Sequence, residues 1–206
     1  NFSLIMGIAG ATASHQGIQL AGLAGLLAGA LSMALGEWIS VKSSQELHEN
    51  QMQIELEELE TNPEGEMKEL ALIYMAKGIP EDQASQMAAE IMKDKGHAHD
   101  ILVKEELGIN AEELKGSAVE AAVYSFILFA IGAAIPVLPF MFTDGMKAII
   151  ISVSASAIGL FVIGAAITLF TGKNVWYSGF RQVSFGLAAA AITFGIGKLI
   201  GVSVAG

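Results

Sequence analysis

The sequence predicts an all-α, multi-pass membrane protein with an acidic helical insert between its second and third membrane helices. Apolar residues make up 53% of the 206 residues, and the mean hydropathy is +0.55, which is high for a soluble domain. Charge is concentrated in one block. Residues 44–115 hold 18 acidic and 6 basic side chains, whereas the other 134 residues hold 3 and 5.

Charge-free windows on both sides of this block define the membrane helices, each of which needs ~20 mostly apolar residues. The windows after the block are residues 121–143, 148–172 and 182–197, and the last can be extended on both sides. No charge occurs over residues 1–36, and a polar run at 12–17, which contains His15, divides this stretch into a short apolar segment and a helix over about 17–41. We therefore expect five membrane helices, the first only partly contained in this chain.

The same pattern predicts the domains and the orientation. Residues 1–43 carry the first two membrane helices, residues 44–115 form the insert, and residues 116–206 carry the last three. Lys42 flanks the insert, and Lys173 and Arg181 lie in the loop over 172–181, whereas the turn near 145 has only Lys147. Positive charge favours the cytoplasmic side, so we expect the insert to face the cytoplasm.

Composition excludes several classes of protein. A net charge of −10 argues against a nucleic-acid binder, because an acidic chain repels phosphate. The absence of Cys excludes disulfides and thiolate metal sites. We find no catalytic triad pattern, phosphate-binding glycine loop or cofactor motif, so we expect neither an enzyme nor a prosthetic group.

Turn residues divide the insert into short helices, which we expect over 63–77, 80–95 and 97–107, after a helix over 44–61 that continues the second membrane helix without a breaker. Pro63 suits the first position of a helix, and Gly78 and Gly108 suit positions just after helix ends. Gly96 is expected to break a helix, and Asn110 to cap a last one.

Small residues and prolines mark the membrane segments. Gly25 with Gly29, and Gly197 with Gly201, have the four-residue spacing of close helix contacts, although glycine is common in any membrane helix. Pro136 and Pro139 remove two backbone N–H donors from the third span, so we expect this pair to kink or end that helix.

Carboxylates recur in the insert with a spacing that suggests a divalent metal site. Glu55 and Glu58 share one helix face, and Glu66 and Glu69 repeat that spacing beyond the Pro63 turn. A helix–turn–helix there would bring the two pairs together. Such oxygen-rich groups suit hard or borderline divalent ions, whereas the alternative is a merely solvated acidic face.

Other potential ligands carry weaker signals. Glu105 and Glu106 end a later helix of the insert. His48, His97 and His99 are candidates, but residues two apart on a helix do not share one ion. The Glu-x-x-His pairs of ferritin-like proteins are absent from the sequence, so we do not infer a ferroxidase.

Residues 30–46, Ala-Leu-Ser-Met-Ala-Leu-Gly-Glu-Trp-Ile-Ser-Val-Lys-Ser-Ser-Gln-Glu, resemble the signature of the vacuolar iron transporter family. The glutamate-rich insert, Glu106-Leu-Gly at its end and Pro136-Val-Leu-Pro in the third span extend the resemblance over essentially the whole chain. The resemblance implies five membrane helices, a cytoplasmic helical metal-binding domain, a homodimer, and export of Fe²⁺, often also Mn²⁺, from the cytosol in exchange for protons. It implies a vacuolar or plasma membrane, the inner membrane in bacteria, and Zn²⁺ as a possible surrogate ion.

Residue by residue, the resemblance implies metal ligands at Glu55, Glu58, Glu66, Glu69 and Glu106, and a translocation-path methionine at Met33. This chain departs from the family at three positions. A membrane glutamate of some members is Gly25 here, and a methionine pair is Leu102 and Val103. The aspartate of the first helix would fall before residue 1.

As a mechanism, we expect the carboxylates of the insert to collect Fe²⁺ and pass it to a dimer-interface path lined by Met33. Protons compete with metal for carboxylates, so a proton gradient can drive release. Glu37, at the cytoplasmic end of the second helix, is a further candidate because ionisable groups in a membrane are usually functional.

Three alternatives stay open at this point. The first is a manganese-selective or channel-like exporter of the same architecture. The second is a membrane-anchored metal buffer or sensor that binds ions without transporting them. The third is a structural membrane protein with a solvated acidic loop.

Overall fold

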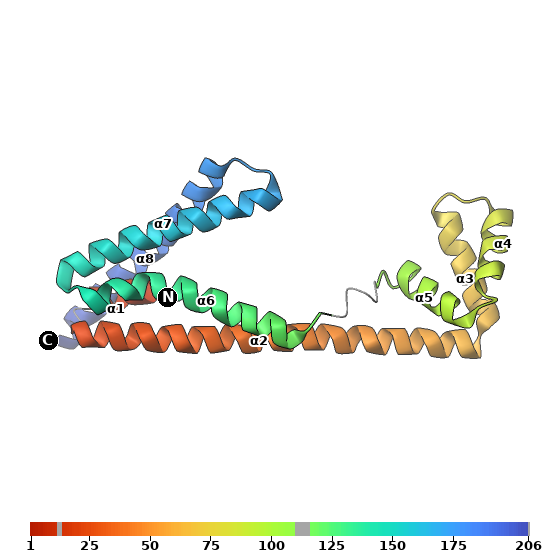
Figure 1. The fold of residues 1–206 in the computed structure, drawn as a ribbon, viewed down its shortest axis with the longest axis horizontal. Coiled ribbons are helices and arrows are strands. Elements are labelled where there is room, and N and C mark those ends of the chain that lie inside the picture. The colour runs from red at the N-terminus through yellow and green to blue at the C-terminus, as the bar shows by residue number, and fades with distance from the viewer. Residues whose placement is uncertain (12–13, 110–115, 206) are drawn as a thin grey trace. The chain divides into compact units, whose positions relative to one another are not determined.

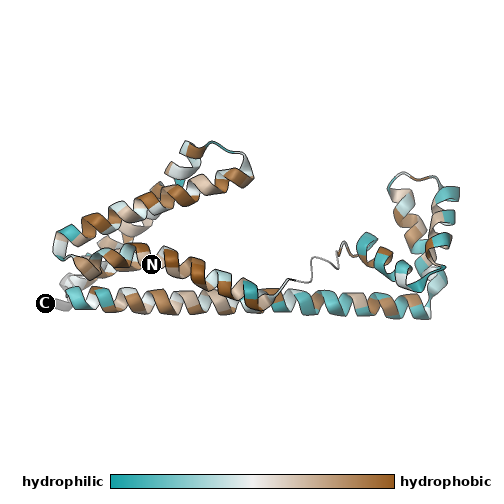
Figure 2. Ribbon diagram, in the orientation of Figure 1, coloured by the Kyte–Doolittle hydropathy of each residue, from teal (hydrophilic) through white to brown (hydrophobic). Residues whose placement is uncertain are grey.

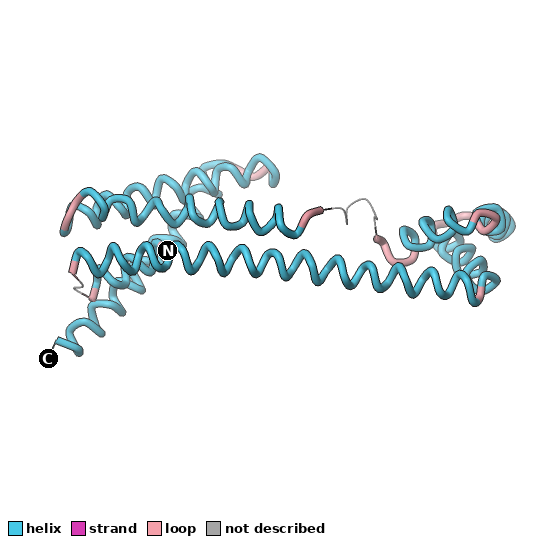
Figure 3. The backbone as a smooth tube through the Cα atoms, turned by 60° about the horizontal axis from the view of Figure 1, so that its bottom comes forward, coloured by secondary structure: helices cyan, strands magenta, loops and turns pink. Residues whose placement is uncertain are grey.

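The computed structural model describes residues 1–11, 14–109 and 116–205, and the regular structure in these ranges is α-helical (Figures 1 and 3). The helices are α1 (Phe2–Gly10), α2 (His15–Thr61), α3 (Pro63–Ala76), α4 (Glu81–Ile91), α5 (Lys95–Glu105), α6 (Ala118–Phe142), α7 (Gly145–Thr171) and α8 (Val175–Ala205). The chain forms two compact units, Asn1–Gly36 with Ala122–Gly206, and Glu37–Ala121. We call them the apolar unit and the acidic unit.

Four helices are long and apolar enough to cross a membrane: α2, α6, α7 and residues Val175–Gly201 of α8. Figure 2 shows α6 and α7 as mostly hydrophobic, whereas α4 and α5 are mostly hydrophilic. The expected helical continuation of the second span into the insert is confirmed, because α2 runs without interruption through 47 residues. Helix α1 has 9 residues and is too short to cross by itself.

Close packing of α1 on α8 depends on glycine. A Cβ atom on Gly197 would overlap the carbonyl oxygen of Gly7, and one on Gly201 would lie 2.6 Å from that of Ala11. The expected close contact at these glycines is therefore made within the chain, between α8 and α1. At Gly25, a Cβ atom would lie 2.5 Å from a methyl group of Leu4, so a larger residue there would require that side chain to shift.

Helix α6 does not end at its prolines. It continues through Pro136 and Pro139 to Phe142, so the prolines do not end it at their own positions, and the expected kink stays a prediction. The carbonyl of Pro136 accepts a hydrogen bond of 2.8 Å from the Ser152 hydroxyl of α7, and that of Pro139 accepts one of 2.8 Å from Thr143. The first of these bonds links α6 to α7 and the second lies at the end of α6, whereas the carbonyls that lose their helical donors are those four residues earlier, at Gly132 and Ile135.

In the acidic unit, α3 begins and ends as expected. Pro63 occupies its first position, and the Asn62 side chain accepts a hydrogen bond of 3.1 Å from the Gly65 amide. Gly78 follows the helix at φ +95°, and Gly108 follows α5 at φ +66°, both in the left-handed region that glycine reaches without steric cost.

The expected boundary between the next two helices is wrong. Helix α4 ends at Ile91 rather than at Lys95, and Gly96 lies inside the first turn of α5 instead of breaking a helix. The reason is Asp94, whose carboxylate accepts hydrogen bonds of 3.0 and 3.2 Å from the amides of Gly96 and His97. This is an N-cap, so the new helix begins before the glycine. The last helix expected from Asn110 lies outside the described residues.

Each unit has its own hydrophobic core. That of the acidic unit joins the end of α2 to α3, α4 and α5 through Leu59, Leu70, Ala71, Tyr74, Ala84, Ala88, Ala98 and Leu102. That of the apolar unit is built from Ile5, Met6, Ile18, Val137, Phe140, Ala148 and Ala190. The first of these cores fixes the helices that carry the candidate metal ligands.

Candidate metal centre

Three carboxylates from three helices meet in the acidic unit. Glu55 lies on α2, Glu66 on α3, and Glu106 directly follows α5. One ligand oxygen from each lies within 4.8 Å of the other two. Oxygens on opposite sides of a divalent ion are ~4–5 Å apart, so one ion can contact all three groups.

Local sequence explains why these side chains converge. The chain reverses at Asn62 and Pro63, which places the last turns of α2 beside the first turns of α3. The end of α5 is held by Leu102 and Val103, which are 0% and 2% exposed. The two positions at which the resemblance implies a methionine pair are thus core residues here.

Two of the three carboxylates are buried, and each keeps one oxygen without a protein partner. Glu55 and Glu66 are 2% and 6% exposed, and each has one buried oxygen that no protein atom hydrogen-bonds. An unpaired buried carboxylate is costly unless a proton or a cation neutralises it. A buried acceptor of this kind points to a positively charged ligand.

The electrostatics follow from this burial. Loss of water, and then the charges of Glu106, Glu66, Glu58 and Glu69, raise the pKa of Glu55 to about 7. Desolvation followed by the neighbouring carboxylates also raises the pKa of Glu66 and of Glu106. The site therefore holds protons in the absence of metal, and a divalent ion must displace them.

Glu58 and Glu69 belong to the rim of the centre. Both are exposed, yet their charges act on the three central carboxylates. Glu105, in contrast, forms an ion pair with Lys77 at the end of α3. The structure therefore directs Glu105 away from the metal centre and leaves Glu106 as the member of that pair that faces it.

The histidines of the acidic unit lie elsewhere. A ring nitrogen of His99 is 2.8 Å from the carbonyl oxygen of Met52, and His97 is exposed in the first turn of α5. His48 is half-buried on α2. Among the described residues, the group of three potential ligands contains none of them.

The two candidates in the membrane part of α2 stand apart from this group. Met33 is 50% exposed in the apolar unit, and Glu37, also exposed, begins the acidic unit. The structure brings neither into the carboxylate group.

Sequence reasoning missed two supporting residues. Asp94 caps the start of α5, the helix that directly precedes Glu106, and Lys77 forms an ion pair with Glu105. The signal for the cap was present, because aspartate immediately before the first helical residue is a common N-cap. The pairing with Lys77 is a tertiary contact with no local signal.

Comparison with known proteins identifies the family of this chain. The sequence model described as the VIT family matches residues 1–198. The "Vacuolar iron transporter" of Acanthamoeba castellanii is 38% identical over 196 residues, which cover 92% of this chain and 72% of that protein. "Vacuolar iron transporter 1" of Arabidopsis thaliana is 32% identical over 200 residues, covering 97% of this chain and 80% of that protein. The chain therefore belongs to the VIT family, a family of membrane transporters and not of enzymes.

Proposed function

We propose that this chain is a proton-coupled transporter that exports Fe²⁺, and also Mn²⁺, from the cytosol. Similar proteins bear the name vacuolar iron transporter. The observation that carries the proposal is the meeting of Glu55, Glu66 and Glu106, two of them buried and each of those with an unpartnered oxygen. Carboxylate-rich sites in helical proteins hold iron and manganese.

In this proposal the acidic unit is a cytoplasmic metal-binding domain. Its three central carboxylates bind the ion, while Glu58 and Glu69 raise the local negative potential and attract cations from solution. Protons compete with the ion because the pKa of Glu55 lies at about 7, so capture is strong at cytosolic pH and weak in acid.

The apolar unit supplies the path through a vacuolar or plasma membrane. Helix α1 packs on α8 as part of a fifth membrane helix, and two copies of the chain form a homodimer whose shared path is lined by Met33. Glu37 then lies at the cytoplasmic entrance of that path, where a carboxylate can accept the ion from the acidic unit.

Flux and binding measured together test this function. The full-length protein is reconstituted into liposomes, and uptake of Fe²⁺ is followed with the interior at pH 5.5 and at pH 7.5. We expect faster uptake into the acidic interior, and inhibition by excess Mn²⁺. Metal binding without flux would favour a buffer or sensor, and flux that ignores the pH gradient would exclude proton coupling.

A further inference from the structure

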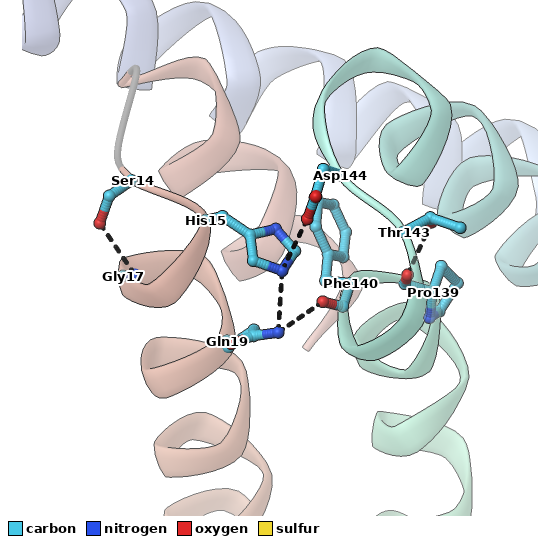
Figure 4. A network of polar contacts seen from close by, with 8 residues as sticks. All are labelled: Ser14, His15, Gly17, Gln19, Pro139, Phe140, Thr143 and Asp144. Atoms are coloured by element: carbon cyan, nitrogen blue, oxygen red, sulfur yellow. Dashed lines mark hydrogen bonds and ion pairs between the residues drawn. The ribbon is translucent and has the colours of Figure 1, made fainter.

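A second polar cluster lies in the apolar unit, where three helix ends meet. His15 begins α2, Phe140 lies in the last turn of α6, and Asp144 immediately precedes α7. Nε2 of His15 is 3.0 Å from a carboxylate oxygen of Asp144 and 2.9 Å from the side-chain nitrogen of Gln19. That nitrogen also donates a hydrogen bond of 2.7 Å to the carbonyl of Phe140 (Figure 4). From the sequence, His15 was only part of a polar turn.

One ring nitrogen cannot serve both contacts in the same protonation state. The carbonyl of Phe140 only accepts hydrogen bonds, so the Gln19 atom that faces it is the NH₂ group, which has a second hydrogen for His15. Nε2 accepts that hydrogen only while it carries none itself. It donates to Asp144 only when it carries a hydrogen, and the contact is an ion pair only when the ring is charged.

Asp144 is free for this contact. It occupies the N-cap position of α7, yet its side chain makes no capping hydrogen bond, and its carboxylate lies beside His15 (Figure 4). The other charged group at this end of α7 is the exposed Lys147. Helix α6 contributes only the Phe140 carbonyl, because its one charged residue, Glu120, lies at its other end, and α2 has no charged residue before Glu37.

We propose that His15 is a proton-binding site at the exit face of the transporter. Binding of a proton moves the Nε2 contact from Gln19, within α2, to Asp144, which adds an ion pair between α2 and α7 while the hydrogen bond from Gln19 to Phe140 of α6 stays in place. The assignment of His15 to the exit face rests on the proposed function. Because α2 crosses the membrane in that function, its first residue faces the compartment into which the ion is released, and an acidic compartment there supplies the proton that a histidine can accept.

The pH titration of the His15 ring tests this proposal without any need for transport. Ring resonances of ¹³C-labelled histidine are followed by NMR in the full-length protein in lipid nanodiscs, and H15Q identifies the His15 signal. In D144N the charged form loses its partner, so the midpoint should move to lower pH. In Q19L the neutral form loses its donor, so the midpoint should move to higher pH. Each shift should be ~0.5 pH unit, as a partly exposed pair allows.

His97 provides the internal control, because it is exposed in the other unit and its signal should not move. Asp144 is 81% exposed, so D144N does not endanger folding. An unchanged His15 midpoint in D144N, or shifts of the same sign in both variants, would overturn the proposal.

Transport provides the second readout. In liposomes, the dependence of Fe²⁺ uptake on interior pH should move to lower pH in D144N and to higher pH in Q19L. Identical profiles in both variants would overturn a role for His15 in transport. Opposite NMR shifts in a protein without any flux would keep the proton site and reject the proposed function instead.

Discussion

Replacing Glu55 by glutamine should stabilise the metal-free acidic unit at high pH. Glu55 is 2% exposed with one unpartnered oxygen, and its pKa rises from the ordinary 4.5 to about 7. Between these two pH values the folded state keeps a proton that the unfolded state has already lost. The free energy of unfolding therefore falls as pH rises through this window. The loss amounts to ~3 kcal/mol at pH 8, and E55Q, which keeps the shape without the charge, should avoid it.

Hydrogen–deuterium exchange of the full-length protein measures this effect locally. At pH 8 without metal, backbone amides of α3 and of the end of α2 should exchange on the order of 100-fold more slowly in E55Q than in the wild type. At pH 5 the difference in exchange rate between E55Q and the wild type should be severalfold smaller, because the wild type still keeps most of the stability that it loses by pH 8. E60Q, at an exposed position of the same helix, is the matched control and should leave the rates unchanged. Equal or faster exchange in E55Q at pH 8 would refute the reasoning.

Three further predictions concern the packing of α8 on α1, the cap of α5 and the roles of Glu105 and Glu106. G197A should lower the free energy of unfolding of the protein in detergent by ~1–3 kcal/mol, because the added methyl group meets backbone of α1. G195A, at a position with open space, should not lower it. Equal melting temperatures of the two variants would contradict this packing. D94A should cost ~1 kcal/mol and speed amide exchange in α5, and unchanged protection there would show that the cap is dispensable. Calorimetric titration with Mn²⁺ should give at least ~10-fold weaker binding in E106Q, a loss of ~1.4 kcal/mol, but near-normal binding in E105Q, and the reverse order would exchange the roles of these neighbours.

Features governed by local chemistry were predictable from the sequence. Pro63 and Gly78 bound α3 as expected, because a fixed φ suits a helix start and a positive φ suits the turn after a helix end. The four long apolar helices follow from charge-free windows alone. The length of α2 was also readable, since no breaker occurs before Asn62.

Features decided by competition between neighbouring residues with opposite helix preferences were not predictable from the sequence. Gly96 looked like a helix breaker, but the Asp94 carboxylate stabilises the helix start and the glycine is tolerated in the first turn. The prolines of α6 were expected to kink or end the helix, but it continues to Phe142, and the Pro136 carbonyl accepts a hydrogen bond from Ser152 of α7. In both places a neighbouring group outweighs the intrinsic propensity of one residue.

In the candidate site, too, some features follow from local sequence and others from tertiary packing. That Glu55 and Glu66 lie together could be predicted, since only a short turn separates their helices. That Glu106 joins them, and Glu105 does not, depends on the packing of α5 and on Lys77, which are distant in sequence. The sharing of His15 between Gln19 and Asp144 likewise needs three helix ends in place.

The central claim is that the carboxylates of the acidic unit collect the ion that the apolar unit transports. The most direct test is the dependence of the Fe²⁺ uptake rate on Fe²⁺ concentration in liposomes, compared between the wild type, E66Q and the exposed control E60Q. The account predicts that E66Q raises the half-saturating concentration by ~10-fold or more while the rate at saturation stays within ~2-fold, and that E60Q changes neither. An unchanged half-saturating concentration in E66Q would contradict it, because transport would then proceed without capture at this centre.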